Sequence, residues 1–267
     1  MRWLLYALAL FLSAPTEAAA APLGVEAALQ KSQAVLGRSL PDLAFSDVSG
    51  RRVRFADFSG RPFLLTLVYT ACSDVCPLVV RNLHPIVENA QELFGADRFA
   101  VLTIGFDARH DTPDRMRAFM RSQGVSLPNW HFLSADQKTI DRLAEAVGFT
   151  FYPAAGGFEH MAQITVVDAN GRIYRQIYGG AFAPPQIVEP LKDVVFGRFR
   201  PLADVESLID KVRLFCTVYD PASGRYYFDY SLFMAIASGA FSLALVATLL
   251  VREWRRSVKL GSREPSR

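Results

Sequence analysis

Two cysteines separated by three residues, Cys72 and Cys76, are the side chains of this sequence best suited to chemistry. A continuous apolar run, 63–69, directly precedes them and predicts a buried strand, and Pro77 favours the first turn of a helix. We therefore expect both thiols on a strand-to-helix turn, pointing the same way if that turn winds helically. The positive end of the helix dipole favours the thiolate form of Cys76, and thiolates bind soft metals and exchange disulfides.

Strands and helices are expected to alternate along the rest of the chain. Apolar runs and a turn signal predict further strands at 99–105, 130–132, 163–167 and 172–178. Capping and stop residues predict helices at 77–94, 112–123, 136–147 and 185–196. A polar hairpin over 45–55 comes before them, and 130–132 is expected to be a short edge strand. This order predicts an α/β fold, with a mixed sheet flanked by helices.

Both ends of the chain predict targeting to a membrane. Residues 1–20 have the layout of a cleaved secretory signal peptide, and an uncleaved N-terminal anchor is the alternative. Residues 231–251 contain no charge and are long enough to form a single transmembrane helix. The basic tail 252–267 that follows places this end in the cytoplasm. We therefore expect a single-pass protein of a bacterial inner membrane, with its main domain in the periplasm.

The exported part is expected to be one domain, 22–197, followed by a linker, 198–230. Aromatic residues near the span are interpreted as anchors at the membrane interface: Tyr226, Tyr227, Phe228, Tyr230 and Trp254. Without the signal peptide and the tail, the chain carries 22 basic and 23 acidic residues, a balance that argues against a nucleic-acid partner. Three cysteines are too few for a disulfide scaffold, so a functional role for the pair is favoured over a structural disulfide or a chance pair.

Three segments resemble the Sco/SenC family of copper proteins, which take part in cytochrome c oxidase assembly and have a thioredoxin-like fold. Residues 69–77 resemble the family motif Tyr-Thr-His-Cys-Pro-Asp-x-Cys-Pro, 107–113 the segment Asp-Pro-x-Arg-Asp-Thr-Pro, and 159–161 the segment Asp-His-Ser. The resemblance covers about 43–196. Departures from the motifs are Ala71, Ser73, Ala108 and His110. The C-terminal span is a further departure, because the better-known members are tethered at the N-terminus.

The resemblance implies that Cys72, Cys76 and His160 bind one copper ion, as Cu(I) or Cu(II). Ligand chemistry agrees, because soft thiolates favour Cu(I) and an imidazole completes a three-ligand site, whereas a structural zinc site wants a fourth ligand. A lone histidine is more often a structural residue, so it is the motif that singles out His160.

Four polar residues are expected around these ligands without binding the ion directly: Asp74, Asp107, His110 and Asp111. His110 is also a candidate outer ligand or entry residue. For Asp74 the alternative is a solvated turn residue, and for Asp111 it is a helix cap together with Thr112.

The other histidines and the third cysteine are expected elsewhere. His84 lies about 12 Å beyond Cys76 along the predicted helix, too far to share a metal with both thiols. His131 is flanked by aromatic residues and is interpreted as packing. Cys216 stays open between a small buried apolar residue, an additional copper ligand and an intermolecular disulfide.

Two functions follow from these residues. The resemblance implies a copper metallochaperone that delivers its ion to the dinuclear copper site of the copper-bearing subunit of cytochrome c oxidase. The alternative is a membrane-tethered thiol–disulfide oxidoreductase that uses Cys72 and Cys76 as a redox pair to reduce the client's cysteines. Other periplasmic copper or thiol-redox proteins are further candidate partners, and a peroxidase is the remaining alternative.

Overall fold

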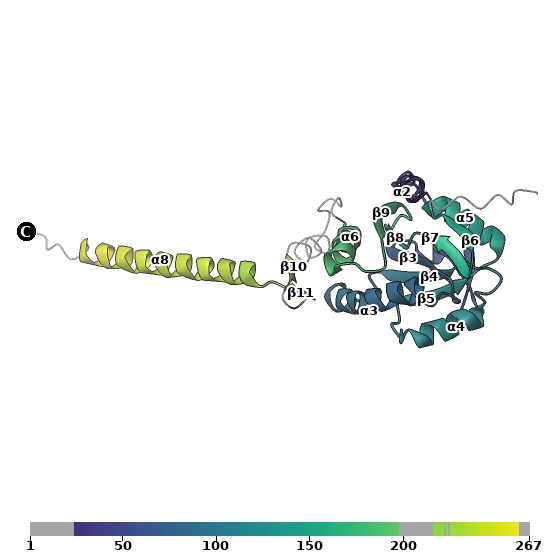
Figure 1. The fold of residues 1–267 in the computed structure, drawn as a ribbon. Helices are drawn as coiled ribbons and strands as arrows, with labels where there is room; N and C mark the ends of the chain where they lie inside the picture. Colours follow the sequence, from purple (N-terminus) through teal and green to yellow (C-terminus); the bar gives the residue numbers. More distant parts are fainter. Residues whose placement is uncertain (1–23, 198–215, 222, 224, 262–267) are drawn as a thin grey trace, which may run out of the picture.

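A computed structural model describes residues 24–197, 216–221, 223 and 225–261. Figure 1 shows a layered α/β domain and one long helix, α8 (Ser231–Gly261), that extends away from it. The predicted signal peptide, 1–20, and the first part of the predicted linker lie outside the described residues.

Seven strands form the central sheet, in the order β2-β1-β5-β4-β3-β8-β9. Their bounds are β1 Ala44–Asp47, β2 Arg52–Arg54, β3 Phe63–Val68, β4 Ala100–Gly105, β5 Trp130–Ser134, β8 Gln163–Val167 and β9 Ile173–Tyr178. β3, β4 and β5 run parallel, whereas the other pairs are antiparallel, so the predicted mixed sheet is confirmed. Every residue of β3 and β4 is buried, as expected for central strands covered on both faces.

The prediction of an edge strand at 130–132 is wrong. β5 lies between β4 and β1, because the β1–β2 hairpin adds to its free side. Ser46 pairs with Ser134, and Asp47 pairs with Leu133. The sequence contained both segments, but their pairing depends on a contact between residues almost ninety positions apart.

The helices of the described domain include the four predicted ones, one of which begins two residues before Pro77, and two that the sequence did not predict, at 25–33 and 55–58. They are α2 Val25–Gln33, the 3₁₀ helix η1 Phe55–Phe58, α3 Val75–Phe94, α4 Pro113–Ser122, α5 Gln137–Val147 and α6 Pro184–Phe196. Thr112 and Asp136 accept hydrogen bonds from the first turns of α4 and α5. α3 is the longest helix of the domain. It begins shortly after the central strand β3, and it packs against α6.

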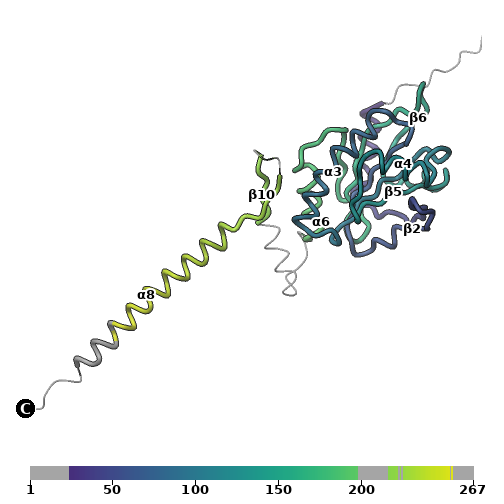
Figure 2. The backbone as a smooth tube through the Cα atoms, turned by 90° about the horizontal axis from the view of Figure 1, so that it is seen from below, coloured from purple at the N-terminus to yellow at the C-terminus, as the bar shows by residue number. Residues whose placement is uncertain are grey.

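Two small hairpins lie outside the main sheet. β6 (Phe151–Ala154) pairs with β7 (Gly157–His160), and β10 (Thr217–Asp220) pairs with β11 (Arg225–Phe228). Figures 1 and 2 place β6 and α8 at opposite ends of the molecule, with β10 near the start of α8. The described part of the predicted linker 198–230 therefore contains a hairpin, and β11 packs on α3.

In the part of the chain that the structure describes, α8 is the one helix long and apolar enough to cross a membrane. The segment Ser231–Arg252 has 22 residues, a mean hydropathy of 2.2, and no side chains buried inside the protein. Tyr226 does not belong with the interfacial aromatics assigned to this region, because its side chain is 3% exposed and packs into the domain. Tyr227 and Tyr230 are exposed.

Candidate metal centre

Cys72 and Cys76 lie on the turn from β3 into α3, as the sequence predicts. α3 begins at Val75, with Asp74 at the N-cap position, so Cys76 is in the first turn and Pro77 is the third helical residue. The Cys76 N–H donates to the Cys72 sulfur at 3.4 Å. Cys76 is 2% exposed and Cys72 is half-buried, and both are free thiols.

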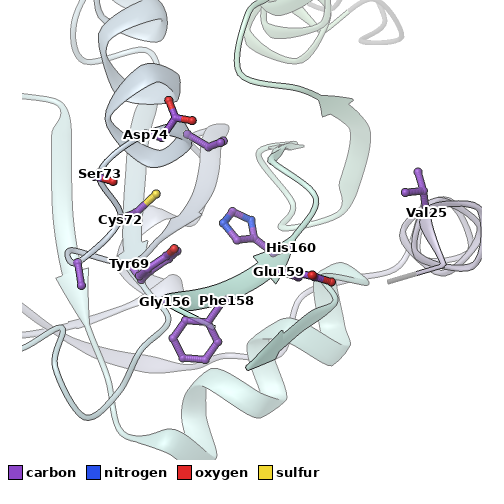
Figure 3. A pocket seen from close by; sticks show the side chains of 11 residues that line it. Val25, Tyr69, Cys72, Ser73, Asp74, Gly156, Phe158, Glu159 and His160 are labelled. Atoms are coloured by element: carbon purple, nitrogen blue, oxygen red, sulfur yellow. The ribbon is translucent and has the colours of Figure 1, made fainter. Parts of the chain in front are cut away.

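His160 approaches the cysteines from a different element, the end of β7. Its Nε2 atom lies 4.0 Å from the Cys76 sulfur, and its ring points toward the cysteine turn in Figure 3. The buried Nδ1 atom makes no well-formed hydrogen bond, although the Met161 backbone lies near enough to act on the pKa of the ring. Burial also lowers the pKa of His160, so the ring is held neutral, the form that binds metals.

The pKa values of the two thiols are shifted in opposite directions, which corrects the expectation of a thiolate at Cys76. Burial raises the pKa of Cys76 far above that of a free thiol, in spite of its place in the first helical turn. Burial also acts on Cys72, but the N–H groups of Cys76 and Asp74 donate to its sulfur and bring its pKa below the ordinary value. The helix N-terminus therefore favours a thiolate at Cys72, because that sulfur accepts the free N–H groups.

Tyr69 is a site residue that the sequence reasoning did not single out. Its hydroxyl is within hydrogen-bonding reach of the Cys72 sulfur, and its ring lies 5.9 Å from that of His160. Gly157 has a φ of +148°, and a Cβ at that position would lie 2.6 Å from the Tyr69 hydroxyl. The glycine thus lets the β6–β7 hairpin, which carries His160, close against Tyr69. The signal available in the sequence was that Tyr69 is the first residue of the motif segment 69–77.

Asp111 is buried, at 2% exposure, and holds two loops together. Its carboxylate accepts hydrogen bonds from the N–H and hydroxyl of Thr70 and from the Asp107 N–H, at 2.7 to 2.9 Å. Gly105 makes room for it, because a Cβ there would lie 2.4 Å from Asp111. Burial raises the pKa of Asp111. The proposed helix cap is therefore Thr112 alone, and Asp111 ties the cysteine turn to the loop after β4.

The remaining outer residues are more exposed. His110 Nδ1 and Asp107 Oδ2 are 2.7 Å apart, and the His110 side chain is 68% exposed. Asp74 makes no capping hydrogen bond with its side chain and contributes its backbone N–H to Cys72. Asp74 and Glu159 line an open hollow of about 460 Å³ beside Cys72 and His160 (Figure 3).

The donor atoms suit a soft metal, but the three side chains are not yet arranged around one common metal position. Two sulfurs from the turn into α3 and one neutral imidazole from β7 converge, a set that fits copper better than a cation that prefers oxygen. Within the described ranges, no three His, Cys, Asp or Glu side chains already stand in metal-binding geometry. A metal bound by Cys72, Cys76 and His160 therefore requires side-chain rotation.

Comparison with known proteins identifies the family. The SCO1/SenC family model matches residues 37–195, more than half of the chain. This chain belongs to the SCO1/SenC family. A Stutzerimonas stutzeri protein whose name proposes copper binding is 23% identical over 147 residues, which cover 51% of this chain and 67% of the relative.

Solved structures of Sco proteins share the fold of this SCO1/SenC chain. Bradyrhizobium japonicum ScoI, solved with copper bound, gives a TM-score of 0.50 at 24% identity and covers 58% of this chain and 99% of its own. BsSco gives 0.53 at 17% identity, with 62% and 96% covered, and is described as having a disulfide switch and as a member of the Sco family of cytochrome c oxidase assembly proteins. The thioredoxin-like fold is thereby confirmed.

The histidines and cysteine expected elsewhere in this SCO1/SenC chain lie apart from the site. The ring of His131 packs on Phe58, with centroids 5.3 Å apart, and the ring of His84 lies 6.0 Å from that of Trp130. Cys216 is buried, at 4% exposure, at the base of the β10–β11 hairpin. That hairpin packs on α3 near Asn89, about 20 Å along the helix from Cys76, so Cys216 is not a fourth ligand in this conformation.

Proposed function

We propose that this SCO1/SenC protein is a copper metallochaperone that binds one copper ion through Cys72, Cys76 and His160. The observation that carries the proposal is the approach of His160 Nε2 to 4.0 Å from the Cys76 sulfur, on a ring that burial keeps neutral. The names of the relatives support it, since one proposes copper binding and another structure was solved with copper. The proposed client is the dinuclear copper site of the copper-bearing subunit of cytochrome c oxidase, in line with the described role of BsSco.

Copper is cargo in this proposal, and its transfer is an exchange of ligands. Cys72 is half-buried and is the more acidic thiol, so it is the first ligand to bind an incoming ion and the first that a client thiolate can reach. Cys76 is buried and His160 lies beside it, so these two ligands hold the ion while the outer ligand is replaced. No covalent bond of the client forms or breaks.

A thiol–disulfide oxidoreductase is the second candidate, and the unequal thiols favour it. The Cys72 thiolate would attack a client disulfide to form a mixed disulfide, and Cys76 would then attack the Cys72 sulfur. The client would leave with two reduced thiols, while Cys72 and Cys76 become a disulfide. The disulfide switch described for BsSco supports this chemistry.

Copper titration tests the proposal. The reduced full-length chain in detergent should saturate at about one equivalent of Cu(II) and show sulfur-to-copper charge transfer. The same chain after oxidation of Cys72 and Cys76 should bind none, because thiolate is the ligand. Equal binding by the reduced and oxidised chains contradicts the proposed site.

We also propose the topology expected from the sequence, with 1–20 cleaved, the domain in the periplasm and 252–267 in the cytoplasm. The span Ser231–Arg252 and the basic residues after it support this orientation in the inner membrane. Alkaline phosphatase fused after Gly197 should be active, and the same enzyme fused after Arg267 should be inactive. The reverse pattern contradicts the topology and, with it, access to an oxidase copper site.

A further inference from the structure

The β10–β11 hairpin is fastened to α3 through Tyr226. The Tyr226 N–H donates to Asn89 Oδ1 at 3.0 Å, and Asn89 Nδ2 donates to the Tyr226 carbonyl at 3.4 Å. The Tyr226 hydroxyl donates to Glu189 of α6 at 2.8 Å. Asn89 and Tyr226 are 7% and 3% exposed, so one side chain of the hairpin is locked between two helices.

The other strand of the hairpin is fastened to α6. Lys192 Nζ donates to the Thr217 carbonyl at 3.3 Å and pairs with Glu189 at 2.9 Å. Lys192 is 8% exposed. Both strands therefore place polar groups against the domain, and removing the hairpin would leave the buried Asn89 amide without partners and take one acceptor from Lys192.

Two residues, Asp229 and Tyr230, separate the hairpin from α8. The Asp229 N–H donates to the Cys216 carbonyl at 2.7 Å, and Asp229 Oδ1 accepts from the Ser231 N–H at 2.8 Å. The rings of Phe228 and Phe233 stack across this junction, with centroids 6.1 Å apart. The connection between domain and apolar helix is thus short and hydrogen-bonded.

We propose that the β10–β11 hairpin is a rigid support, called the seat below, that fixes the orientation of the domain relative to the lipid bilayer. The C-terminal half of α3 then lies on the membrane side of the domain, and the copper-site cysteines lie about 20 Å from Asn89 measured along this helix. The partner surface is the interfacial layer of the bilayer, met by Tyr227 and Tyr230, which are 50% and 66% exposed. This inference rests on α8 spanning the membrane, and it restricts clients to those that present their site at that height.

Energy transfer from the domain to the membrane tests the seat. The full-length, copper-free chain is placed in nanodiscs that carry an acceptor dye on the lipid, with a fluorescent amino acid at exposed Lys138 of α5, away from α8 in Figure 1. Time-resolved transfer should give one narrow distribution of distances. Six Gly and Ser residues inserted between Asp229 and Tyr230 should broaden it by roughly 13 Å, the r.m.s. span of such a linker.

Two substitutions separate docking from linker length. Asn89→Ala combined with Tyr226→Ala should broaden the distribution, because the hairpin loses its buried contacts with α3. Arg225→Ala is the matched control and should leave it narrow, since the Arg225–Glu92 pair is 61% and 62% exposed.

A wild-type distribution as broad as that of the insertion overturns the seat, and so does an insertion that changes nothing. A chain that does not enter nanodiscs overturns the seat and the span together. Copper titration is independent of all these results, so failure of the proposed copper site is recognised separately.

Discussion

The two ends of α3 differ in how completely their polar groups are paired. At the C-terminal half, Asn89 and Tyr226 satisfy each other, and Glu189 and Lys192 complete the set. At the N-terminal end, His160 Nδ1 is buried without a well-formed hydrogen bond, although its ring lies beside the buried Cys76.

This difference separates a docking contact from a binding site. A buried polar group without a partner costs stability, so the site end is less completely satisfied in this conformation than the seat end. The seat end needs no further ligand, because its partners are all parts of this chain. The site end keeps a neutral imidazole and two free thiols beside an open hollow, which is what an incoming soft metal requires.

The largest expected effect comes from removing the thiols at the site end. The double variant Cys72→Ser, Cys76→Ser should lose copper binding, from about one equivalent to almost none, because hydroxyls are poor ligands for Cu(I). Cys216→Ser is the matched control at the other end of α3 and should keep full stoichiometry. Copper titration followed by absorption measures both, and equal loss in the control would show that the two ends are not separate.

His160 should give the next largest effect. His160→Ala removes the imidazole closest to Cys76 and should weaken copper binding by at least about a hundredfold, more than loss of an outer residue typically costs. His84→Ala should change affinity little, because His84 lies further along α3. Competition with a copper chelator measures the affinities. If His160→Ala binds normally, His110 becomes the leading third ligand.

The buried carboxylate at the site end should affect stability. Asp111→Ala leaves the N–H and hydroxyl of Thr70 and the Asp107 N–H without their acceptor, at a cost of about 3 kcal/mol. Asp114→Ala, on the exposed face of α4, should stay within about 0.5 kcal/mol of wild type. Urea unfolding of the apo chain measures the difference. Similar values for both variants would mean that Asp111 does not hold the cysteine turn.

The smallest expected effect is on the pH dependence of stability, away from both ends. Burial, with Arg61 and Arg51 nearby, lowers the pKa of His131 in the folded chain. In the unfolded chain His131 takes up a proton near pH 6.5, whereas in the folded chain it does so only at lower pH. The contribution of His131 to the free energy of unfolding is therefore fully present above about pH 6.5 and is lost as the pH falls below it. His131→Gln should therefore flatten the decline in unfolding free energy between pH 7.5 and 5.5. A steeper decline in the variant would reverse the assigned sign.

The local parts of the site followed from sequence, because short-range patterns decide them. The apolar run before Cys72 and the helix after it are properties of neighbouring residues, and the structure has β3 and α3 there. The role of Asp111 was harder to predict, because an Asp before Thr-Pro favours a cap whereas Gly105 and Thr70 draw it inward. The short segment 130–132 was predicted to be an edge strand because no local pattern shows that β1 pairs with β5.

The sequence by itself determined the family, the pair of thiols on a strand-to-helix turn, and an apolar segment able to span a membrane. Tertiary structure decided which thiol is acidic, because burial of Cys76 outweighs its helical position while Cys72 receives the free N–H groups. It also brought His160 to the cysteines across 84 residues and fastened the hairpin around Tyr226 to α3. Desolvation and long-range contact depend on the whole packed chain, so no local pattern could report them.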